Sequence, residues 1–274
     1  MRRIILLLIF WFPIGILFGQ NTIGLPDIIN YKKGIYNAGA QNRRILQDKN
    51  GIMYFANNEG VLSFDGKNWK IYPLPNKSIV RSIEFGPDNK LYAGGQDEFG
   101  SFSTDKNGQL QYKSLKHLIP PEDRSFTDVW NIVFFQDRLF FQTTNKIYEV
   151  KGDECTIHKS PNWRFFNACH NRLIAQEGEK GILVFQNGIW VPLIKPDALP
   201  PDFLVTATYP LPGDSTLVTS RKHGLYILKG NNLTPLRSSF LDKIAPKYLS
   251  GATPVNEEHI AVVTNLEGCF IIDK

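Results

Sequence analysis

The side chains best suited to catalysis or metal binding are too scattered in this sequence to form a recognisable motif. No two of the five histidines are spaced i, i+4, and none of the three cysteines belongs to a CxxC pair. The HExxH, GxSxG and P-loop patterns are also absent. We therefore expect no metal, no cofactor and no enzymatic activity in this chain. The histidines are His117, His158, His170, His223 and His259.

Two short segments resemble known motifs but are predicted to be turns. Ser103-Thr104-Asp105-Lys106 has S-x-x-K spacing, yet it runs directly into Asn107-Gly108, a turn sequence. Asp48-Lys49-Asn50-Gly51 resembles the start of a Ca²⁺-binding loop, but the following acidic ligands and the terminal glutamate are missing. We expect both segments to be solvated hairpin connections.

The cysteines at positions 155, 169 and 269 are expected to be packing residues. The alternative to free cysteines, in an exported protein, is a disulfide between Cys155 and Cys169. The apolar sequence around Cys269, GCFII, predicts that this side chain is buried.

Polar side chains recur at two kinds of position: after a predicted second strand, and at the start of a predicted inner strand. Amides, carboxylates, guanidiniums and an indole on one concave rim would suit a polar ligand such as an oligosaccharide or a short peptide. The alternative for each residue is a solvated loop. These ligand-binding candidates are Arg43, Asn58, Glu59, Arg81, Gln96, Asp97, Glu98, Trp130, Asn131, Glu177, Arg221 and His223.

A repeated unit supplies the elements that would position these residues. Each unit has an apolar strand, a turn, a second strand, a polar loop, a third strand that opens on a glycine, and a fourth strand that often carries an aromatic residue such as Trp69 or Trp190. The glycine positions recur every 35 to 46 residues, with Lys146 in the place of one glycine. The units span residues 43–74, 80–115, 129–160, 165–195, 205–237 and 247–274, the last one incomplete.

This period predicts an all-β fold, a β-propeller of four-stranded antiparallel blades. Alternating apolar residues bounded by turns indicate strands, and four strands in about 40–45 residues is the length of a propeller blade. Helical turns are expected only at 117–125 and 238–246, between units.

Composition and the N-terminus favour an exported globular protein. Hydrophobic residues make up 42% and charged residues 21% of the 274 residues, which excludes a disordered chain. Residues 1–19 combine two arginines with an apolar run from Ile4 to Gly19 and predict a cleaved signal peptide, an uncleaved anchor being the alternative. Without Arg2 and Arg3 the net charge falls from +5 to +3, too small for a nucleic-acid-binding surface.

The first unit, ILQDKNGIMYFANNEGVLSFDGKNW, resembles the two-component regulator propeller repeat, and LYAGGQDEFGSF in the second unit is similar to a segment of exported sensors of Bacteroidota regulators. The resemblance covers about residues 35–274. The family's Trp-x-Gly-Thr is replaced by Tyr54-Phe55-Ala56-Asn57 in the first unit.

The resemblance implies seven blades, followed by a triple-tyrosine module, a membrane helix and a histidine kinase or helix-turn-helix output. We therefore expect an N-terminal fragment of a sensor. The alternative is six units closed by the lead-in segment, residues 20–42.

The expected function is non-catalytic ligand sensing on the periplasmic or extracellular side, with the membrane reached only through a downstream segment. A polar small ligand, a protein partner or a second copy in a homodimer are the expected partners, and nucleic acid is not. The alternatives are a secreted interaction scaffold and a glycan-active lyase or hydrolase.

Overall fold

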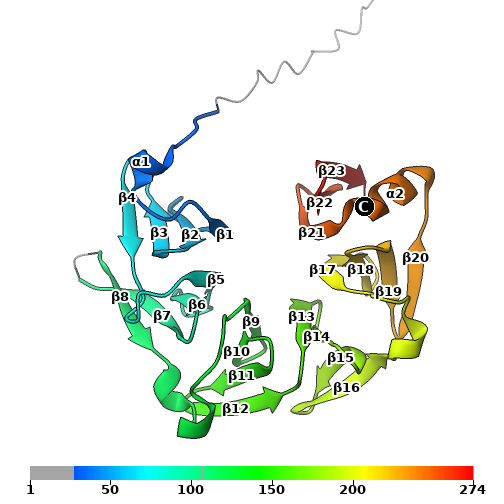
Figure 1. The fold of residues 1–274 in the computed structure, drawn as a ribbon, viewed down its shortest axis with the longest axis horizontal. Helices are drawn as coiled ribbons and strands as arrows, with labels where there is room; N and C mark the ends of the chain where they lie inside the picture. The colour runs from blue at the N-terminus through cyan, green and yellow to red at the C-terminus, as the bar shows by residue number, and fades with distance from the viewer. Residues whose placement is uncertain (1–27, 107, 274) are drawn as a thin grey trace, which may run out of the picture. The chain divides into compact units, whose positions relative to one another are not determined.

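Six antiparallel sheets follow one another along the chain in the computed structural model, which describes residues 28–106 and 108–273. Five sheets have four strands in sequential order, and the sixth has three. They are blades 1 to 6 of a β-propeller, as the repeat predicts. In Figure 1 the blades follow each other around a central opening, from blue in blade 1 to red in blade 6. The predicted leader, residues 1–19, lies outside the described residues.

The first strand of every blade borders the central opening (Figure 1). Each inner strand leads through a short turn into the second strand, as Asp48 to Gly51 does in blade 1. The inner strands are β1 (Asn42–Gln47), β5 (Val80–Phe85), β9 (Asn131–Phe135), β13 (Trp163–Cys169), β17 (Val205–Leu211) and β21 (Leu249–Pro254).

The second and third strands form the middle of each blade. Alternate side chains point to opposite faces of a strand, so both faces of a middle strand can be buried between neighbouring blades. The second strands are β2 (Met53–Asn57), β6 (Leu91–Gly95), β10 (Arg138–Gln142), β14 (Arg172–Glu177), β18 (Ser215–Ser220) and β22 (His259–Thr264). The third strands are β3 (Gly60–Phe64), β7 (Phe99–Thr104), β11 (Lys146–Lys151), β15 (Gly181–Gln186), β19 (Gly224–Lys229) and β23 (Gly268–Asp273).

Outer strands complete blades 1 to 5, and no described strand pairs with the free edge of β23. The lead-in does not supply one within the described residues, because α1 (Lys33–Tyr36) contacts β4 of blade 1 instead. The outer strands are β4 (Trp69–Tyr72), β8 (Leu110–Ser114), β12 (Glu154–Lys159), β16 (Ile189–Ile194) and β20 (Asn232–Leu236).

Short helices occupy the two predicted inter-blade segments. Between blades 2 and 3 the chain forms 3-10 turns η1 (Lys116–Leu118) and η2 (Pro121–Asp123). Between blades 5 and 6 it forms α2 (Ser239–Ile244), capped by Ser238, and then η4 (Ala245–Lys247). The expectation that helical turns occur only in those two segments is wrong, because η3 (Pro196–Ala198) joins blades 4 and 5 and α1 precedes blade 1. No helix in the described part of the chain is both long and apolar enough to span a membrane.

The hydrophobic core is divided into clusters that each join two neighbouring blades. Phe99 of blade 2 stacks on Phe141 of blade 3 with ring centroids 4.1 Å apart, and both side chains are fully buried. Other clusters join blades 1 and 2, 3 and 4, 4 and 5, and 5 and 6. Packing between blades therefore holds consecutive repeats together, since the blades share few backbone hydrogen bonds.

The three cysteines are free, so Cys155 and Cys169 do not form the alternative disulfide. Cys169 is buried and Cys155 half-buried, but the predicted burial of Cys269 is wrong, because its side chain is exposed. Cys269 lies opposite Val263 on a sheet face of blade 6 that is exposed to solvent.

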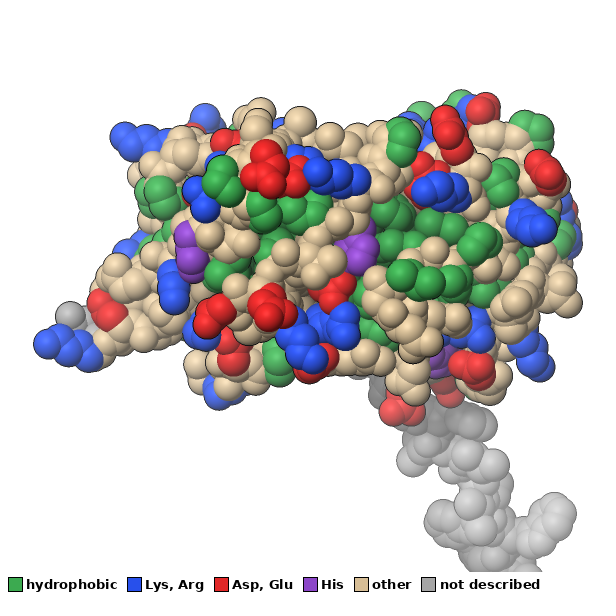
Figure 2. All heavy atoms as spheres, turned by 90° about the horizontal axis from the view of Figure 1, so that it is seen from below, with side chains coloured by type: hydrophobic (Ala, Val, Ile, Leu, Met, Phe, Trp, Pro, Cys, Tyr) green, Lys and Arg blue, Asp and Glu red, His purple; other side chains and the backbone are tan. Residues whose placement is uncertain are grey.

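The outer wall of the propeller carries both signs of charge. In Figure 2 acidic and basic side chains lie near one another along both edges, and hydrophobic side chains gather in the band between them. The carboxylate of Asp123, in η2, lies 3.1 Å from Lys146 Nζ and 2.8 Å from Lys159 Nζ of blade 3. The hydrogen bond from Lys159 is the largest cause of the lowered pKa of Asp123. Such mixed surfaces do not concentrate a field of one sign.

Candidate functional site

The inner strands begin at one end of the propeller, which we call the mouth face, and several carry a β-bulge there. The pairing register shifts between Val80 and Ser82, between Trp163 and Phe165, and at the matching places of β1, β17 and β21. A bulge leaves one residue unpaired and re-aims its side chain. The residues at these bulges are Arg43, Arg81, Arg164, Thr206 and Ser250, with Trp130 at the matching place just before β9.

Three of these side chains, from three different blades, converge on the mouth face. The guanidinium carbon of Arg43 lies 5.6 Å from the ring centre of Trp130, and that of Arg81 lies 5.4 Å from it. Both distances are within the range of a cation–π interaction. The Trp130 side chain is 42% exposed and its Nε1 donates a 3.3 Å hydrogen bond to Thr144 Oγ1. We call Arg43, Arg81 and Trp130 the mouth cluster.

The two arginines of the mouth cluster differ in charge compensation. Arg81 Nε donates to Asp128 Oδ1 at 3.0 Å, and both side chains are mostly buried. Arg43 is exposed and forms no ion pair with any residue that the structure describes. The mouth cluster therefore presents one uncompensated guanidinium beside an exposed aromatic ring.

The ligand-binding candidates Gln96 and Asp97 lie in the loop between β6 and β7 of blade 2, and their contacts stabilise that loop. Gln96 forms an isolated β-bridge with Asp128, which fixes the partner of Arg81. The carboxylate of Asp97 lies 3.0 Å from Lys116 Nζ, and its Oδ1 accepts from the backbone of Phe126. These contacts tie the inter-blade segment 115–128 to blade 2.

Glu98 and Glu177 are buried and serve as hydrogen-bond acceptors within blades 2 and 4. Glu98 accepts from Tyr112 and Ser114 at 3.2 and 2.7 Å. Burial, followed by the charge of Glu98, raises the pKa of Tyr112 far above its ordinary value. Glu177 accepts from Ser160 at 2.5 Å and from the backbone N–H groups of residues 179 and 180 at 2.7 Å.

The pKa of Glu177 is lowered as a net result of opposing effects. Burial disfavours the charged carboxylate, but the hydrogen bonds from Ser160 and from the backbone of Glu179 and Lys180 outweigh it. The carboxylate therefore fixes the β14–β15 loop of blade 4. Its oxygens are engaged by the protein rather than directed at the mouth cluster.

Asn58, Glu59 and Asn131 lie on the mouth face without joining the mouth cluster. Asn131 Nδ2 donates to the carbonyl of Phe166 at 2.5 Å and links blades 3 and 4. The backbone of Asn58 donates to Gln41, and its buried Oδ1 has no hydrogen bond to any described residue. Glu59 is exposed.

Arg221 and His223 form a separate pair of contacts beside blades 5 and 6. The Arg221 guanidinium lies 5.8 Å from the ring centre of Tyr248, which is itself partly exposed. His223 stacks on Phe203 with centroids 5.8 Å apart and contacts the carbonyl of Pro201 through Nε2 at 2.9 Å.

Sequence reasoning missed Asp128, which orients Arg81, and Arg164, which occupies the bulge of blade 4. Strand β13 begins at Trp163, so the predicted start of the fourth unit at residue 165 left Arg164 between units. Aligning Trp163-Arg164 with Val80-Arg81 would have found it. No local sequence pattern predicts the role of Asp128, because it pairs with Arg81, which is 47 residues away in the sequence.

Comparisons with known proteins identify the fold. No family model matches the chain, and no curated protein matches it in sequence. A virginiamycin B lyase from Staphylococcus aureus is similar in backbone, with a TM-score of 0.64 and 16% identity over 86% of this chain and 81% of that one. The extracellular domain of a B. thetaiotaomicron protein described as a one-component system has a TM-score of 0.51 and 15% identity. The match covers 86% of this chain but 38% of that domain. A streptogramin B lyase has a TM-score of 0.55 and 14% identity. Likenesses at these identities show the propeller fold alone.

Proposed function

We propose that this chain is the ligand-sensing propeller of an exported signal-transduction regulator and that it binds a polar ligand at the mouth cluster without transforming it. The apolar run after Arg2 and Arg3 supports export. The resemblance of the repeats to regulator propellers and the backbone likeness to an extracellular signalling domain support a sensor. The ligand-binding part rests on one observation, the convergence of Arg43 and Arg81 on Trp130.

The chemistry of the mouth cluster favours a ligand with an acidic group beside a ring or another flat surface. The exposed Trp130 ring offers a stacking surface, and the fork of Arg43 can bind a carboxylate or sulfate through two parallel hydrogen bonds. Arg81 is held by Asp128 and orients the indole rather than neutralising a ligand. An acidic oligosaccharide or an acidic peptide fits this description.

Signalling would follow from differential affinity. A ligand on the mouth cluster contacts side chains of blades 1, 2 and 3, so its binding favours the arrangement of blades in which those side chains converge. The output can be shifted by no more than the difference in affinity between the two states of the sensor. The output module and any membrane helix would lie in a downstream segment.

The test uses digalacturonate and α-1,4-galactobiose, which carry a carboxylate and a hydroxymethyl group at C6 respectively, together with the N-acetylated, C-amidated dipeptides Glu-Tyr and Gln-Tyr, of which only the first carries a carboxylate. We expect calorimetry to show binding of at least one acidic probe and binding about tenfold weaker for its neutral counterpart. Arg43→Ala should abolish that preference, and Arg43→Lys should restore it in part. Arg237→Ala is the control, since Arg237 is an exposed arginine paired with Asp242 near α2.

Equal binding of acidic and neutral probes, or equal loss in the Arg43 and Arg237 variants, would contradict the proposed site. In the complete regulator, Arg43→Ala should also remove ligand-dependent output without lowering the amount of protein.

The likeness to virginiamycin B and streptogramin B lyases lends weight to the lyase part of the alternative, a glycan-active lyase or hydrolase, although neither neighbour is described as acting on a glycan. A bound acidic oligosaccharide would then be cleaved. Chromatography of the probe after overnight incubation with the protein separates the two functions: an unchanged probe supports sensing, and new products that are lost in Arg43→Ala support catalysis.

A further inference from the structure

A cavity lies at the end of the propeller opposite the mouth face, where the inner strands end in hairpin turns; we call this end the hairpin face. The cavity has a volume of about 370 Å³ and lies between blades 1 and 2. Its size is within the lower part of the range for small-molecule sites. The mouth cluster contributes no residue to it. The lining residues are Gln47, Asp48, Lys49, Asn50, Tyr54, Phe85, Asn89, Leu91, Phe102, Thr104 and Leu110.

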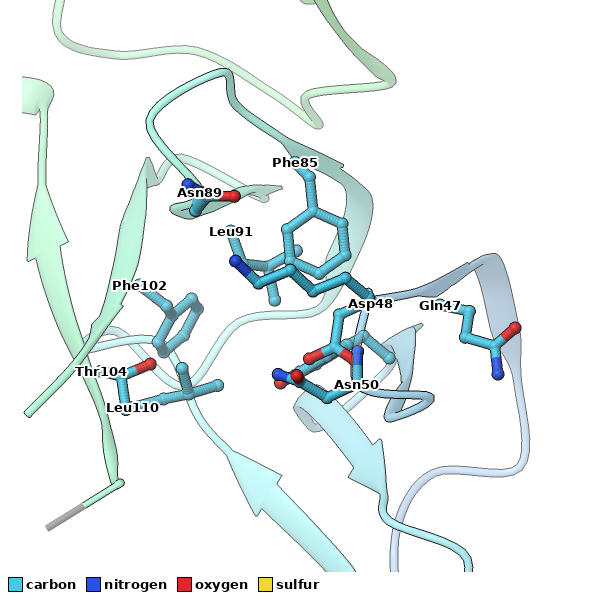
Figure 3. A pocket seen from close by; sticks show the side chains of 11 residues that line it. Gln47, Asp48, Asn50, Phe85, Asn89, Leu91, Phe102, Thr104 and Leu110 are labelled. Carbon is cyan, nitrogen blue, oxygen red and sulfur yellow. The ribbon is translucent and has the colours of Figure 1, made fainter.

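Aromatic and aliphatic side chains form the inner wall of this cavity. Leu91 and Phe102 are buried, and the rings of Tyr54 and Phe85 meet edge to face at 5.6 Å. In Figure 3 Phe85, Leu91 and Phe102 of blade 2 line one side, and Asp48 and Asn50 come from the blade 1 turn. Such a wall can cover the apolar face of a small ring.

The rim of the cavity carries polar groups that the fold does not use. The side chains of Lys49, Asn50, Asn89 and Thr104 have no hydrogen bond or ion pair with any residue that the structure describes. By contrast, Asp48 is fixed by its own turn, because Oδ1 accepts from the backbone of Asn50 at 2.8 Å and of residue 52 at 2.9 Å.

The Tyr54 hydroxyl lies behind the rim, since its side chain is buried and forms a hydrogen bond with Asp48. Burial, and then the charge of Asp48 with which it forms a hydrogen bond, raises its pKa to about 12. It therefore stays neutral throughout the physiological range. The formal charges of Asp48 and Lys49 offset one another within the same turn.

Although Lys49 is unpaired among the described residues, the turn has no net formal charge and the inner wall is apolar, so a buried carboxylate would lose hydration that a neutral ligand does not have to give up. Amide and hydroxyl groups both donate and accept hydrogen bonds, which is the requirement for recognising hydroxyl groups. We propose that the cavity between blades 1 and 2 binds a neutral hydroxylated ring of monosaccharide size, with its apolar face against Phe85 and Phe102 and its hydroxyls toward Asn50, Asn89 and Thr104. This site is independent of the proposed mouth site.

Saturation-transfer NMR on the full chain tests the proposal with glucose, galactose, mannose, rhamnose and myo-inositol, and with glucuronate as the charged counterpart. We expect at least one neutral ring to bind with a dissociation constant in the millimolar range. Glucuronate should bind about tenfold more weakly. The double variant Asn50→Ala, Thr104→Val removes two rim groups on the exposed side of the cavity and should abolish the signal. Its melting temperature, measured alongside, should match that of the wild type.

Two matched variants separate this site from the mouth cluster. Asn187→Ala changes an asparagine in another hairpin turn, that of β15 and β16, and should leave the signal unchanged. Arg43→Ala should also leave it unchanged, while the rim variant should keep the acidic preference of the mouth. The proposal is overturned if no neutral ring binds, if glucuronate binds as well as glucose, or if the folded rim variant still gives the full signal.

Discussion

At the scale of single residues, the molecule uses its polar side chains for two different tasks. Glu98, Asp97 and Glu177 satisfy backbone and hydroxyl donors and thereby hold loops in place. Arg43 and Trp130, which lie at the starts of inner strands, remain accessible to solvent. For Glu98 and Glu177 the difference arises from burial, because a buried carboxylate must find donors in the protein whereas an exposed guanidinium need not. Asp97 is about half exposed and is held by its ion pair with Lys116.

Glu177 gives a pH-dependent prediction at this scale. Its pKa is lowered in the folded state, so its contribution to the free energy of unfolding is present above the unfolded pKa of about 4.3 and is lost as the pH falls through the folded value. Glu177→Gln should lower that free energy at pH 7 by about 1–3 kcal/mol, because charge-assisted hydrogen bonds are lost. The deficit should shrink between about pH 5 and pH 3.

Urea titrations of wild type and Glu177→Gln across pH 3–7 measure this deficit. Glu179→Gln is the control, because Glu179 is exposed and nearby in the same loop. A deficit that does not change with pH would mean that Glu177 acts through packing rather than charge.

At the scale of the element, the blade depends on glycine where the third strand begins close to the outer strand. Gly181 opens β15 with φ +81°, and a Cβ placed there would lie 2.3 Å from the carbonyl oxygen of Ile194. The oxygen belongs to the backbone of β16 and has little room to move. Gly60 likewise combines a positive φ with a close approach to the outer strand, whereas Gly100 has only the close approach and Gly224 and Gly268 have only the positive φ, so glycine recurs in the repeat for two separable reasons.

Two glycines of blade 4 separate these effects. Gly188 has φ +83°, nearly the same as Gly181, but a Cβ there would meet no atom within 4 Å. Gly188→Ala should cost about 1 kcal/mol for the left-handed backbone alone, and Gly181→Ala should cost more than about 2–3 kcal/mol because strain is added. Equilibrium urea denaturation measures both, and equal costs would mean that the β16 backbone yields without penalty.

At the scale of the whole molecule, each blade is stabilised by its neighbours, so the sheet faces of blades 1 and 6 that border the open sector lack such support. Figure 1 shows this sector between β1 and β21–β23. Ile45 in blade 1 and Val263 and Ile271 in blade 6 are exposed on these blades at 56%, 39% and 55%. Within the described part of the chain, these side chains lack the cover that a neighbouring blade gives to the other sheet faces.

Val262 and Val263 test how much of blade 6 is covered in solution. They are adjacent in β22 and point to opposite faces, so Val262 is fully buried toward blade 5 whereas Val263 is 39% exposed. Val262→Ala should lower the free energy of unfolding by about 1.5–3 kcal/mol and Val263→Ala by about 0.5 kcal/mol or less. Urea denaturation of the wild type and both variants, each at two protein concentrations, measures these differences in the free energy of unfolding. Equal costs that grow with concentration would show that a second copy covers the exposed face.

The sequence alone determined the repeated blade, because strand alternation, turn residues and the period of the glycines are local properties of the chain. It also placed Arg43, Arg81 and Trp130 among the ligand-binding candidates, since each stands at the start of an inner strand. The helical turns between blades 2 and 3 and between blades 5 and 6 were also predicted from local sequence, whereas η3 between blades 4 and 5 was not.

Only the tertiary structure decided which candidates act together. Arg43 and Trp130 are 87 residues apart in sequence and meet because the curvature of successive blades brings their inner strands around one opening. The exposure of Cys269 was mispredicted for the same reason, since an apolar sequence does not reveal whether a neighbouring blade covers it. The cavity on the hairpin face likewise depends on the packing of two blades. The sequence pattern of a single repeat does not predict how that repeat packs against the next one.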